Sequence, residues 1–202
     1  MTLVDDVLVR SLGQVEYLAA YEAMRAFTAG RNESTADEIW LLEHASVYTL
    51  GQAAAIPNVN NGIALVQTDR GGEITYHGPG QAVLYTLVDL ARRGIKVRGF
   101  VSLLEQAVID LLDGRGERRP GAPGVYVDGA KIAALGIRVS RGRAYHGLAL
   151  NVEMDLAPFA AIDPCGYPGL AVTQMHDLGY TGTVEAMGAR LAAIIVEKLG
   201  HA

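Results

Sequence analysis

The most restrictive feature of the sequence is a block of three β-type runs joined by tight turns. The runs cover residues 125–127, 132–139 and 144–152. The dipeptide Asp128-Gly129 favours a hairpin between the first two runs, and Gly142 marks a second tight turn. Strands connected by such short turns pair in antiparallel fashion. The chain is therefore expected to contain an antiparallel sheet to which the other elements are added.

The remaining pattern places a few helices between further short strands. Apolar residues at helical spacing predict helices over residues 15–27, 100–112 and 184–199. Other β-rich segments are expected at residues 7–12, 39–42, 46–50, 64–68 and 82–90. Strands in blocks with few helices predict an α+β (mixed α/β) fold, with a largely antiparallel or mixed sheet flanked by helices. Because no linker interrupts the pattern, residues 1–202 are expected to form a single domain.

Composition excludes several classes of protein. Half of the 202 residues are apolar, yet no apolar run is long enough to span a bilayer. The net charge of −5 argues against a general nucleic-acid binder. No histidine or cysteine cluster has zinc spacing, so no metal site is expected. The N-terminus is acidic where a secretory signal would be basic, which predicts a cytoplasmic protein without a membrane anchor.

Cys165, the only cysteine, lies in a loop between Pro164 and Gly166. A lone thiol is either a small buried apolar group or a reactive one, and its loop setting favours reactivity. Lys131 follows the Asp-Gly turn and begins an apolar run. It is either a snorkelling surface lysine or a functional cation, and a cation near a thiol lowers the thiol pKa.

A glycine-rich segment over residues 70–81 contains His77. Glycine at this density lets a ligand approach the backbone closely. The segment does not follow phosphate-loop spacing, because no Lys-Ser or Lys-Thr pair ends it. His77 is a candidate base, donor or simple turn residue. His146 lies between apolar residues, where a histidine is more often a satisfied core residue than a catalyst.

Four motifs together resemble one enzyme family. The first two are Arg70-Gly-Gly-Glu-Ile-Thr-Tyr-His-Gly-Pro-Gly-Gln81 and Gly129-Ala-Lys-Ile-Ala-Ala-Leu-Gly-Ile-Arg-Val139. The other two are His146-Gly-Leu-Ala-Leu-Asn151 and Pro164-Cys-Gly166. Their order and spacing are similar to those of the octanoyltransferases of lipoate biosynthesis. The resemblance extends from residue 43 to the final helix, with a departure at Ala45-Ser46, where relatives often carry prolines.

The resemblance implies a fold shared with biotin and lipoate protein ligases. It implies transfer of octanoyl from acyl carrier protein to a lysine of a lipoyl domain, as in 2-oxoacid dehydrogenases and the glycine cleavage H protein. Cys165 is then the expected acyl-thioester nucleophile and Lys131 its activating partner, with no cofactor. The expected substrate pocket comprises Arg70, Gly71, Gly72, Glu73, Ile74, Thr75, Tyr76, His77, Ala134, Leu135, Gly136, Gly147, Leu148 and Ala149.

Two other functions stay open from the residues. An ATP-dependent lipoate ligase on the same fold would activate the acid as an adenylate and would need no thiol, so Cys165 counts against it. A noncatalytic acyl-binding module would use Cys165 and Lys131 only structurally. Mass spectrometry of the protein mixed with octanoyl-acyl carrier protein distinguishes all three functions.

Basic residues are grouped at two places in this net-acidic chain. One group is Arg92, Arg93, Lys96 and Arg98, and the other is Arg138, Arg141 and Arg143. Either group is an ordinary solvated loop or a patch that steers acidic carrier proteins to the pocket. Steering predicts that salt slows transfer from a protein-borne donor and not from a small thioester.

Overall fold

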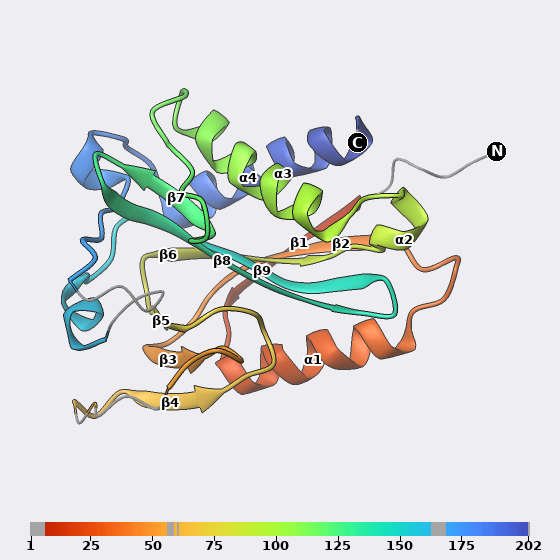
Figure 1. Cartoon of the computed structure of the whole chain (residues 1–202), viewed down its shortest axis with the longest axis horizontal. Helices are drawn as coiled ribbons and strands as arrows, with labels where there is room; N and C mark the ends of the chain where they lie inside the picture. Colours follow the sequence, from red (N-terminus) through yellow and green to blue (C-terminus); the bar gives the residue numbers. More distant parts are fainter. Residues whose placement is uncertain (1–6, 56–58, 60, 163–168, 202) are drawn as a thin grey trace.

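The computed structural model describes residues 7–55, 59, 61–162 and 169–201, and a six-stranded sheet lies at its centre (Figure 1). The strand order is β1-β2-β6-β9-β8-β7. The strands are β1 (Val7–Gln14), β2 (Asp37–Glu43), β6 (Gln81–Leu87), β7 (Gly124–Val127), β8 (Ala130–Ser140) and β9 (Arg143–Asn151). β1 is parallel to β2, and the other neighbouring pairs are antiparallel. The predicted α+β fold with a largely antiparallel sheet is confirmed.

The three predicted helices cover both faces of this sheet. Helices α3 (Val97–Leu111) and α4 (Val184–Gly200) pack on one face, and α1 (Tyr17–Gly30) packs on the other (Figure 1). The first face buries a large apolar cluster that includes Phe100 and Leu191. The second face buries a smaller cluster around Met24 and Trp40. Burial of these apolar faces is the main force that holds the layers together.

Both predicted tight turns have the backbone conformation that their sequences favour. Asp128 and Gly129 have φ values of 48° and 86°, and Arg141 and Gly142 have φ values of 51° and 79°. Positive φ at two successive turn residues is typical of the type I′ hairpin turn, which matches the twist of antiparallel strands. The β7–β8 and β8–β9 hairpins were therefore predictable from local sequence.

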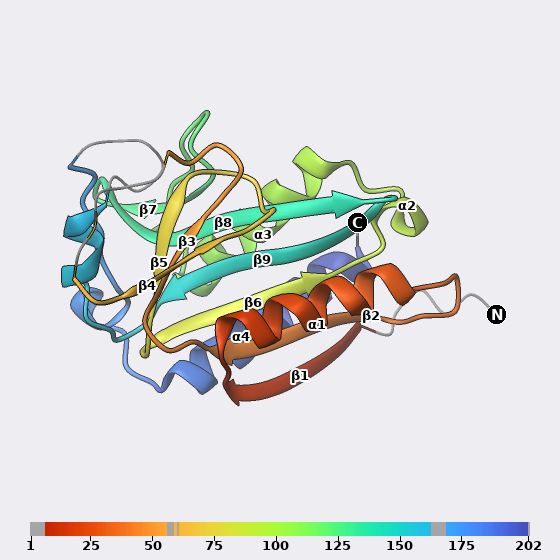
Figure 2. The same ribbon diagram turned by 90° about the horizontal axis from the view of Figure 1, so that it is seen from below.

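A second, three-stranded sheet lies across β8 and β9 on the same side as α1 (Figure 2). Its order is β4 (Ala64–Gln67), β3 (Val47–Leu50) and β5 (Ile74–His77). β3 is parallel to β4 and antiparallel to β5. This small sheet carries the glycine-rich segment, so it brings residues 70–77 over the face of the large sheet.

The structure corrects the sequence prediction after β6. The strand ends at Leu87, and the arginines predicted to lie in a connection are partly in a short helix, α2 (Leu90–Arg93). The Asp89 side chain caps this helix by accepting a hydrogen bond from the Arg92 backbone N–H at 3.0 Å. Two 3₁₀ turns, η1 (Ala157–Ala161) and η3 (His176–Leu178), also interrupt the region after β9.

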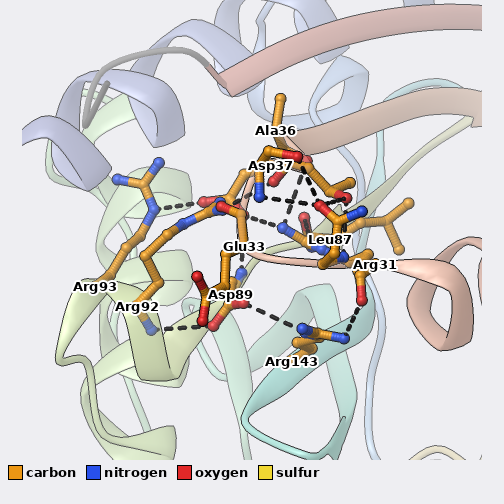
Figure 3. Close-up of polar contacts among 12 residues, drawn as sticks. Arg31, Glu33, Ala36, Asp37, Leu87, Asp89, Arg92, Arg93 and Arg143 are labelled. Atoms are coloured by element: carbon orange, nitrogen blue, oxygen red, sulfur yellow. Dashed lines mark hydrogen bonds and ion pairs between the residues drawn. The ribbon is translucent and has the colours of Figure 1, made fainter. Parts of the chain in front are cut away.

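A buried carboxylate joins several element ends at one end of the large sheet (Figure 3). The side chain of Asp37, at the start of β2, is fully buried and forms ion pairs with Arg31, Arg92 and Arg93. Nη2 of Arg92 and Nε of Arg93 lie 2.7 and 2.6 Å from its two oxygens. Arg93 also donates to the carbonyl of Leu199 in the last turn of α4. Asp37 thus links α1, α2, α4 and the sheet.

Arg143 extends this cluster on the β9 side. It donates to Asp89 Oδ2 at 3.3 Å and to the Arg31 carbonyl at 2.5 Å (Figure 3). Arg92, Arg93 and Arg143 therefore neutralise carboxylates within the fold. Their carboxylate partners offset the positive charge of these three arginines, and the hypothesis that either basic group steers a carrier protein stays a prediction.

Candidate functional site

A cavity of about 380 Å³ lies between the large sheet and residues 70–77. All the residues predicted for the substrate pocket line it except Tyr76, and Lys131 lines it too. Apolar residues of β8, including Ile132 and Ile137, contribute much of its surface. The structure thus brings together two sequence motifs, residues 70–81 and 129–139, that are far apart in the chain.

Small residues on β8 and β9 form paired positions beneath the cavity. Ala134 is opposite Ala149, and Gly136 is opposite Gly147. A Cβ atom on Gly136 would lie 3.0 Å from the Gly71 carbonyl oxygen and 3.1 Å from Cδ of Arg70. Glycine at position 136 therefore lets the glycine-rich segment approach the sheet without displacement.

The glycine-rich segment is fixed over the sheet by hydrogen bonds. The Gly71 N–H donates to the Ile137 carbonyl at 3.1 Å. Arg70 is buried, and its Nη2 donates to both the carbonyl and Oγ1 of Thr49 at 2.6 and 2.9 Å. The Arg70 guanidinium thus ties this segment to β3, and the cavity wall is built before any ligand binds.

Lys131 is buried at the β7 end of the cavity, with only 4% of its surface exposed. Its Nζ donates to the Pro123 carbonyl at 3.0 Å and lies 5.3 Å from the centre of the Tyr126 ring. Its backbone forms a parallel bridge with Val172. A buried ammonium that is held by a carbonyl and an aromatic face is a localised positive charge at an end of the cavity where apolar residues of β8 begin.

Cys165, the predicted nucleophile, lies outside the described residues. The chain that follows it is described from Gly169 onward. Within that part, the Lys131 N–H donates to the Ala171 carbonyl at 2.8 Å, and the Thr173 N–H donates to the Lys131 carbonyl at 2.9 Å. Residues 171–173 are therefore held directly beside Lys131.

Tyr76 corrects the sequence prediction of the pocket. It packs into the cluster beneath the small sheet, with its ring centre 5.6 Å from that of Tyr48 and 5.4 Å from that of Phe159. Its hydroxyl is 2.9 Å from Oγ of Ser46. Ile74, Thr75 and His77 of β5 line the cavity, whereas the Tyr76 side chain is taken up by these contacts within the cluster.

Three buried histidines and several tyrosines lie at one side of the cavity. His77 and His146 line it, and His44 packs against His77 with ring centres 5.8 Å apart. Burial lowers the pKa of His44 to about 4. The His44 Nδ1–H donates to the Val15 carbonyl, so its Nε2 accepts from the Tyr85 hydroxyl at 2.6 Å. The three imidazole rings are uncharged near neutral pH. They form a polar wall of the cavity in which the donors and acceptors of the hydrogen bonds are fixed.

His146 has a hydrogen-bond partner within this wall, which agrees with the interpretation of this histidine as a core residue. Its Nε2 lies 2.8 Å from Asp69 Oδ1, and the Tyr145 hydroxyl donates to Asp69 Oδ2 at 2.6 Å. Burial would raise the pKa of Asp69, but these donors lower it well below its usual value. Tyr145 in turn has its pKa raised to about 12 by burial and by Asp69.

Sequence reasoning missed Tyr17, Tyr85 and Asn151, which also line the cavity. Tyr17 begins α1 and Tyr85 lies in β6, so both have the pattern of ordinary core residues. Asn151 is the last residue of the motif that begins at His146. A polar residue at the end of an apolar strand could have identified it as a site residue. Its hydrogen-bond partners, however, come from other parts of the chain and could not be predicted from that motif.

Two negative observations apply to the part of the chain that the structure describes. In that part, no three histidine, cysteine, aspartate or glutamate side chains are grouped so as to hold a metal ion. Among the same residues, every helix is too short or too polar to cross a bilayer.

Comparisons with known proteins agree with this geometry. A family model described as the lipoyl protein ligase A/B catalytic domain matches residues 5–195. The chain is 60% identical over 190 residues to an octanoyltransferase of Aromatoleum aromaticum, covering 92% of this chain and 82% of that relative.

Two solved structures share the fold. One belongs to the archaeal lipoylation system of Thermoplasma acidophilum, a bipartite lipoate protein ligase and its E2 lipoyl domain. Its TM-score is 0.71 at 15% identity, covering 97% of this chain and 91% of that one. The other is the biotin protein ligase of Aquifex aeolicus in complex with biotin and ATP. Its TM-score is 0.59 at 12% identity, covering 95% of this chain and 70% of that one.

Proposed function

Because the chain belongs to the octanoyltransferases of the lipoyl protein ligase A/B catalytic domain family, we propose that it passes octanoyl through Cys165 to lipoyl domains. The chain is an acyltransferase. The proposed donor is octanoyl-acyl carrier protein, and the proposed acceptor is a specific lysine of a lipoyl domain. The observation that carries this proposal is an apolar cavity with the buried ammonium of Lys131 at its β7 end.

The first half-reaction transfers the acyl group to the enzyme. The Cys165 thiolate attacks the thioester carbonyl of the donor, and a new C–S bond forms as the carrier's C–S bond breaks. The leaving carrier thiolate takes a proton from Lys131, which becomes a neutral amine. This exchange of one thioester for another needs no nucleotide. The position of residues 171–173 beside Lys131 supports a role for Cys165, which lies a few positions earlier in the chain.

The second half-reaction transfers the acyl group to the acceptor. The lysine amine of the lipoyl domain attacks the enzyme thioester, a C–N bond forms, and the C–S bond to Cys165 breaks. The neutral amine of Lys131 takes the proton that the acceptor nitrogen loses. The Cys165 thiolate and the Lys131 ammonium are thereby restored, and the product amide is more stable than the thioester.

The cavity supports an acyl chain of moderate length. The lining residues of β8 run from Lys131 to Ile137, which corresponds to about 20 Å of strand. Paired small residues beneath the cavity leave room for methylene groups beside the strands. In this proposal the acyl carbonyl lies near Lys131 and the alkyl chain extends along β8.

The same proposal covers the protein's partners and place of action. Lipoyl domains of 2-oxoacid dehydrogenases and the glycine cleavage H protein are the proposed acceptors. We further propose that residues 1–202 act as one catalytic domain in the cytoplasm and need no cofactor, no membrane and no nucleic acid. The main rival is an ATP-dependent ligase on the same fold.

Transfer assays with and without nucleotide separate these two enzymes. The purified protein should transfer octanoyl from octanoyl-acyl carrier protein to a lipoyl domain without ATP. It should not transfer free octanoate when ATP and magnesium are supplied. Dependence on ATP together with use of free octanoate would show that the protein is a ligase, and Cys165 would then have no covalent role.

Gly136→Val should reduce transfer of octanoyl more than transfer of a short acyl group. The added side chain would meet the Gly71 carbonyl and Arg70 and would occupy the space beneath the cavity. Because a change of one methylene in an apolar pocket alters kcat/KM by roughly 10- to 200-fold, we expect an effect of at least this order for octanoyl. The measurement is kcat/KM with octanoyl and butanoyl thioesters.

Gly30→Val provides the matched control, because a Cβ atom added at the end of α1 meets nothing within 4 Å outside the backbone of its own helix. It should leave the ratio of octanoyl to butanoyl transfer unchanged. Equal losses for both acyl groups in Gly136→Val would mean that the alkyl chain does not lie over Gly136.

A further inference from the structure

Three buried or partly buried groups connect His77 to the strand that carries Lys131. His77 Nδ1 lies 2.7 Å from Gln81 Oε1, and Gln81 Nε2 donates to Asn151 Oδ1 at 2.9 Å. Asn151 Nδ2 donates to the Thr173 carbonyl at 2.9 Å. The side chains of His77, Gln81 and Asn151 are all buried. The Thr173 N–H donates to the Lys131 carbonyl, so the chain of hydrogen bonds ends at the strand that carries Lys131.

The final acceptor fixes the direction of every bond in this chain. A backbone carbonyl only accepts, so Asn151 must present its NH₂ to Thr173 and its oxygen to Gln81. Gln81 must then present its NH₂ to Asn151 and its oxygen to His77. His77 consequently donates from Nδ1, and in the neutral imidazole Nε2 carries the lone pair.

The surroundings keep His77 neutral and its ring in place. Burial, the neighbouring His44 and Arg70 lower the pKa of His77 to about 3, against the opposing effect of the Gln81 hydrogen bond. Tyr17 stacks on the ring with an interplanar angle of 15° and a centroid distance of 6.0 Å. His77 lines the cavity, and no group in the described part of the chain bonds its Nε2.

We propose that Gln81 and Asn151 are positioning residues that hold His77 in the Nδ1–H form, so that His77 Nε2 accepts a hydrogen bond from the amine of the incoming lysine. This inference rests on the proposed function, because it assigns the contact to the second half-reaction. A hydrogen bond to Nε2 aims the nitrogen lone pair at the thioester carbonyl. Since Thr173 also bonds the Lys131 backbone, one network sets the positions of both His77 and Lys131.

His77 does not take the proton in this scheme. An imidazole whose pKa is about 3 is too weak a base to deprotonate an alkyl ammonium, whose pKa is near 10. The C–N bond forms as the C–S bond to Cys165 breaks, and the proton of the attacking nitrogen passes to Lys131. His77 keeps its hydrogen bond to a remaining N–H until the amide is released.

The structural half of the proposal is tested without any enzyme assay. ¹⁵N nuclear magnetic resonance of the imidazole, assigned by loss of the signals in His77→Asn, reports which ring nitrogen carries the proton. The wild type should show Nδ1–H and an unprotonated Nε2 at neutral pH. Gln81→Leu should mix the two tautomers, and Gln81→Glu, which keeps an acceptor, should retain Nδ1–H. An Nε2–H tautomer in the wild type, or no change in Gln81→Leu, would overturn the proposal.

The functional half is tested by measuring the two half-reactions separately. Gln81→Leu should form the octanoyl-enzyme at nearly the wild-type rate but transfer it to a lipoyl domain about tenfold to a hundredfold more slowly. Gln81→Glu should restore part of that loss. Gln14→Leu, the same change at the exposed end of strand β1, should match the wild type in both steps.

The outcomes separate this inference from the proposed function. If the predicted tautomers are observed but even the wild type transfers no octanoyl, the proposed function is wrong and the positioning network remains. If the wild type transfers octanoyl but Gln81→Leu slows both half-reactions equally, or slows neither, the role of His77 in aligning the amine is wrong.

Discussion

Lys131→Met should lower octanoyl transfer to lipoyl domains by about 10²- to 10⁴-fold, the range typical of a lost acid–base group. Methionine fills a similar length of the cavity but supplies neither a cation for the thiolate nor a base for the incoming amine. Both half-reactions should therefore slow. The measurement is the single-turnover rate of enzyme acylation and of transfer from the isolated octanoyl-enzyme.

Lys131→Arg separates the two roles of this lysine. A guanidinium keeps the positive charge but stays protonated at neutral pH, so it cannot take the proton of the amine. It should restore enzyme acylation more than transfer to the acceptor. The rate of Cys165 alkylation as a function of pH gives an independent check, because loss of the cation should move this curve to higher pH. Identical curves for the wild type and Lys131→Met would exclude Lys131 as the activating group.

Asp37→Asn should be the most destabilising single substitution that keeps the shape of the side chain. It would leave the buried charges of Arg31 and Arg93, and the partly exposed charge of Arg92, without their shared carboxylate. Removing one partner of a buried ion pair typically costs about 3–5 kcal/mol. We expect a loss of that order in the free energy of unfolding, measured by urea denaturation.

The exposed residue Asp113 provides the matched control for Asp37. Asp113→Asn makes the same chemical change at an exposed position with positive φ, which asparagine tolerates. Its effect on the free energy of unfolding should stay within about 0.5 kcal/mol. Equal stabilities for Asp37→Asn and Asp113→Asn would show that the cluster does not stabilise the fold.

Asp37 also predicts how stability depends on pH. Burial would raise its pKa, but the Asp89 N–H together with Arg93 and Arg31 lowers it below the usual value. A carboxyl whose pKa is lower in the folded state contributes stability above its unfolded pKa of about 3.9. That contribution should be lost as pH falls through the folded pKa. Asp37→Asn should show a weaker loss of stability with acid than the wild type.

The elements that could be predicted from the sequence are those set by neighbouring residues. The β7–β8 and β8–β9 hairpins follow from the turns at Asp128-Gly129 and Gly142, whose φ values suit the local sequence. The three long helices follow from the spacing of their apolar residues. Strands β3 and β4 of the small sheet were visible only as separate β-rich segments, and β5 was not predicted because it lies within the glycine-rich segment.

What could not be predicted depends on contacts between distant parts of the chain. In the sequence, Asp37 is the last residue of a polar segment that predicts a loop. In the folded protein it is surrounded by Arg31, Arg92 and Arg93. Arg92 and Arg93 formed a plausible surface group with Lys96 and Arg98 in the sequence, since charge density alone does not show which side chains form ion pairs within the fold. The end of β6 was misplaced because Asp89 caps a helix that only four residues form.

The candidate site also combines features that local sequence predicts with features that depend on contacts between distant residues. Motifs identified its lining residues, but the resemblance gave whole segments and could not tell which side chains of β5 reach the cavity. Tyr76 belongs to such a segment but does not line the cavity. The network from His77 through Gln81 to Asn151 depends on the antiparallel register of β6 and β9, which places Gln81 opposite Asn151. No local pattern contains that register.

Intact-protein mass spectrometry after mixing with octanoyl-acyl carrier protein tests the central claim most directly. The wild type should gain the mass of one octanoyl group, and peptide mapping should place it on Cys165. Cys165→Ala should gain no mass, and adding a lipoyl domain should move the octanoyl group from the wild-type enzyme to the acceptor lysine. An adduct that persists in Cys165→Ala, or a wild-type enzyme that acylates its acceptor without ever carrying octanoyl, would contradict a covalent mechanism through this thiol.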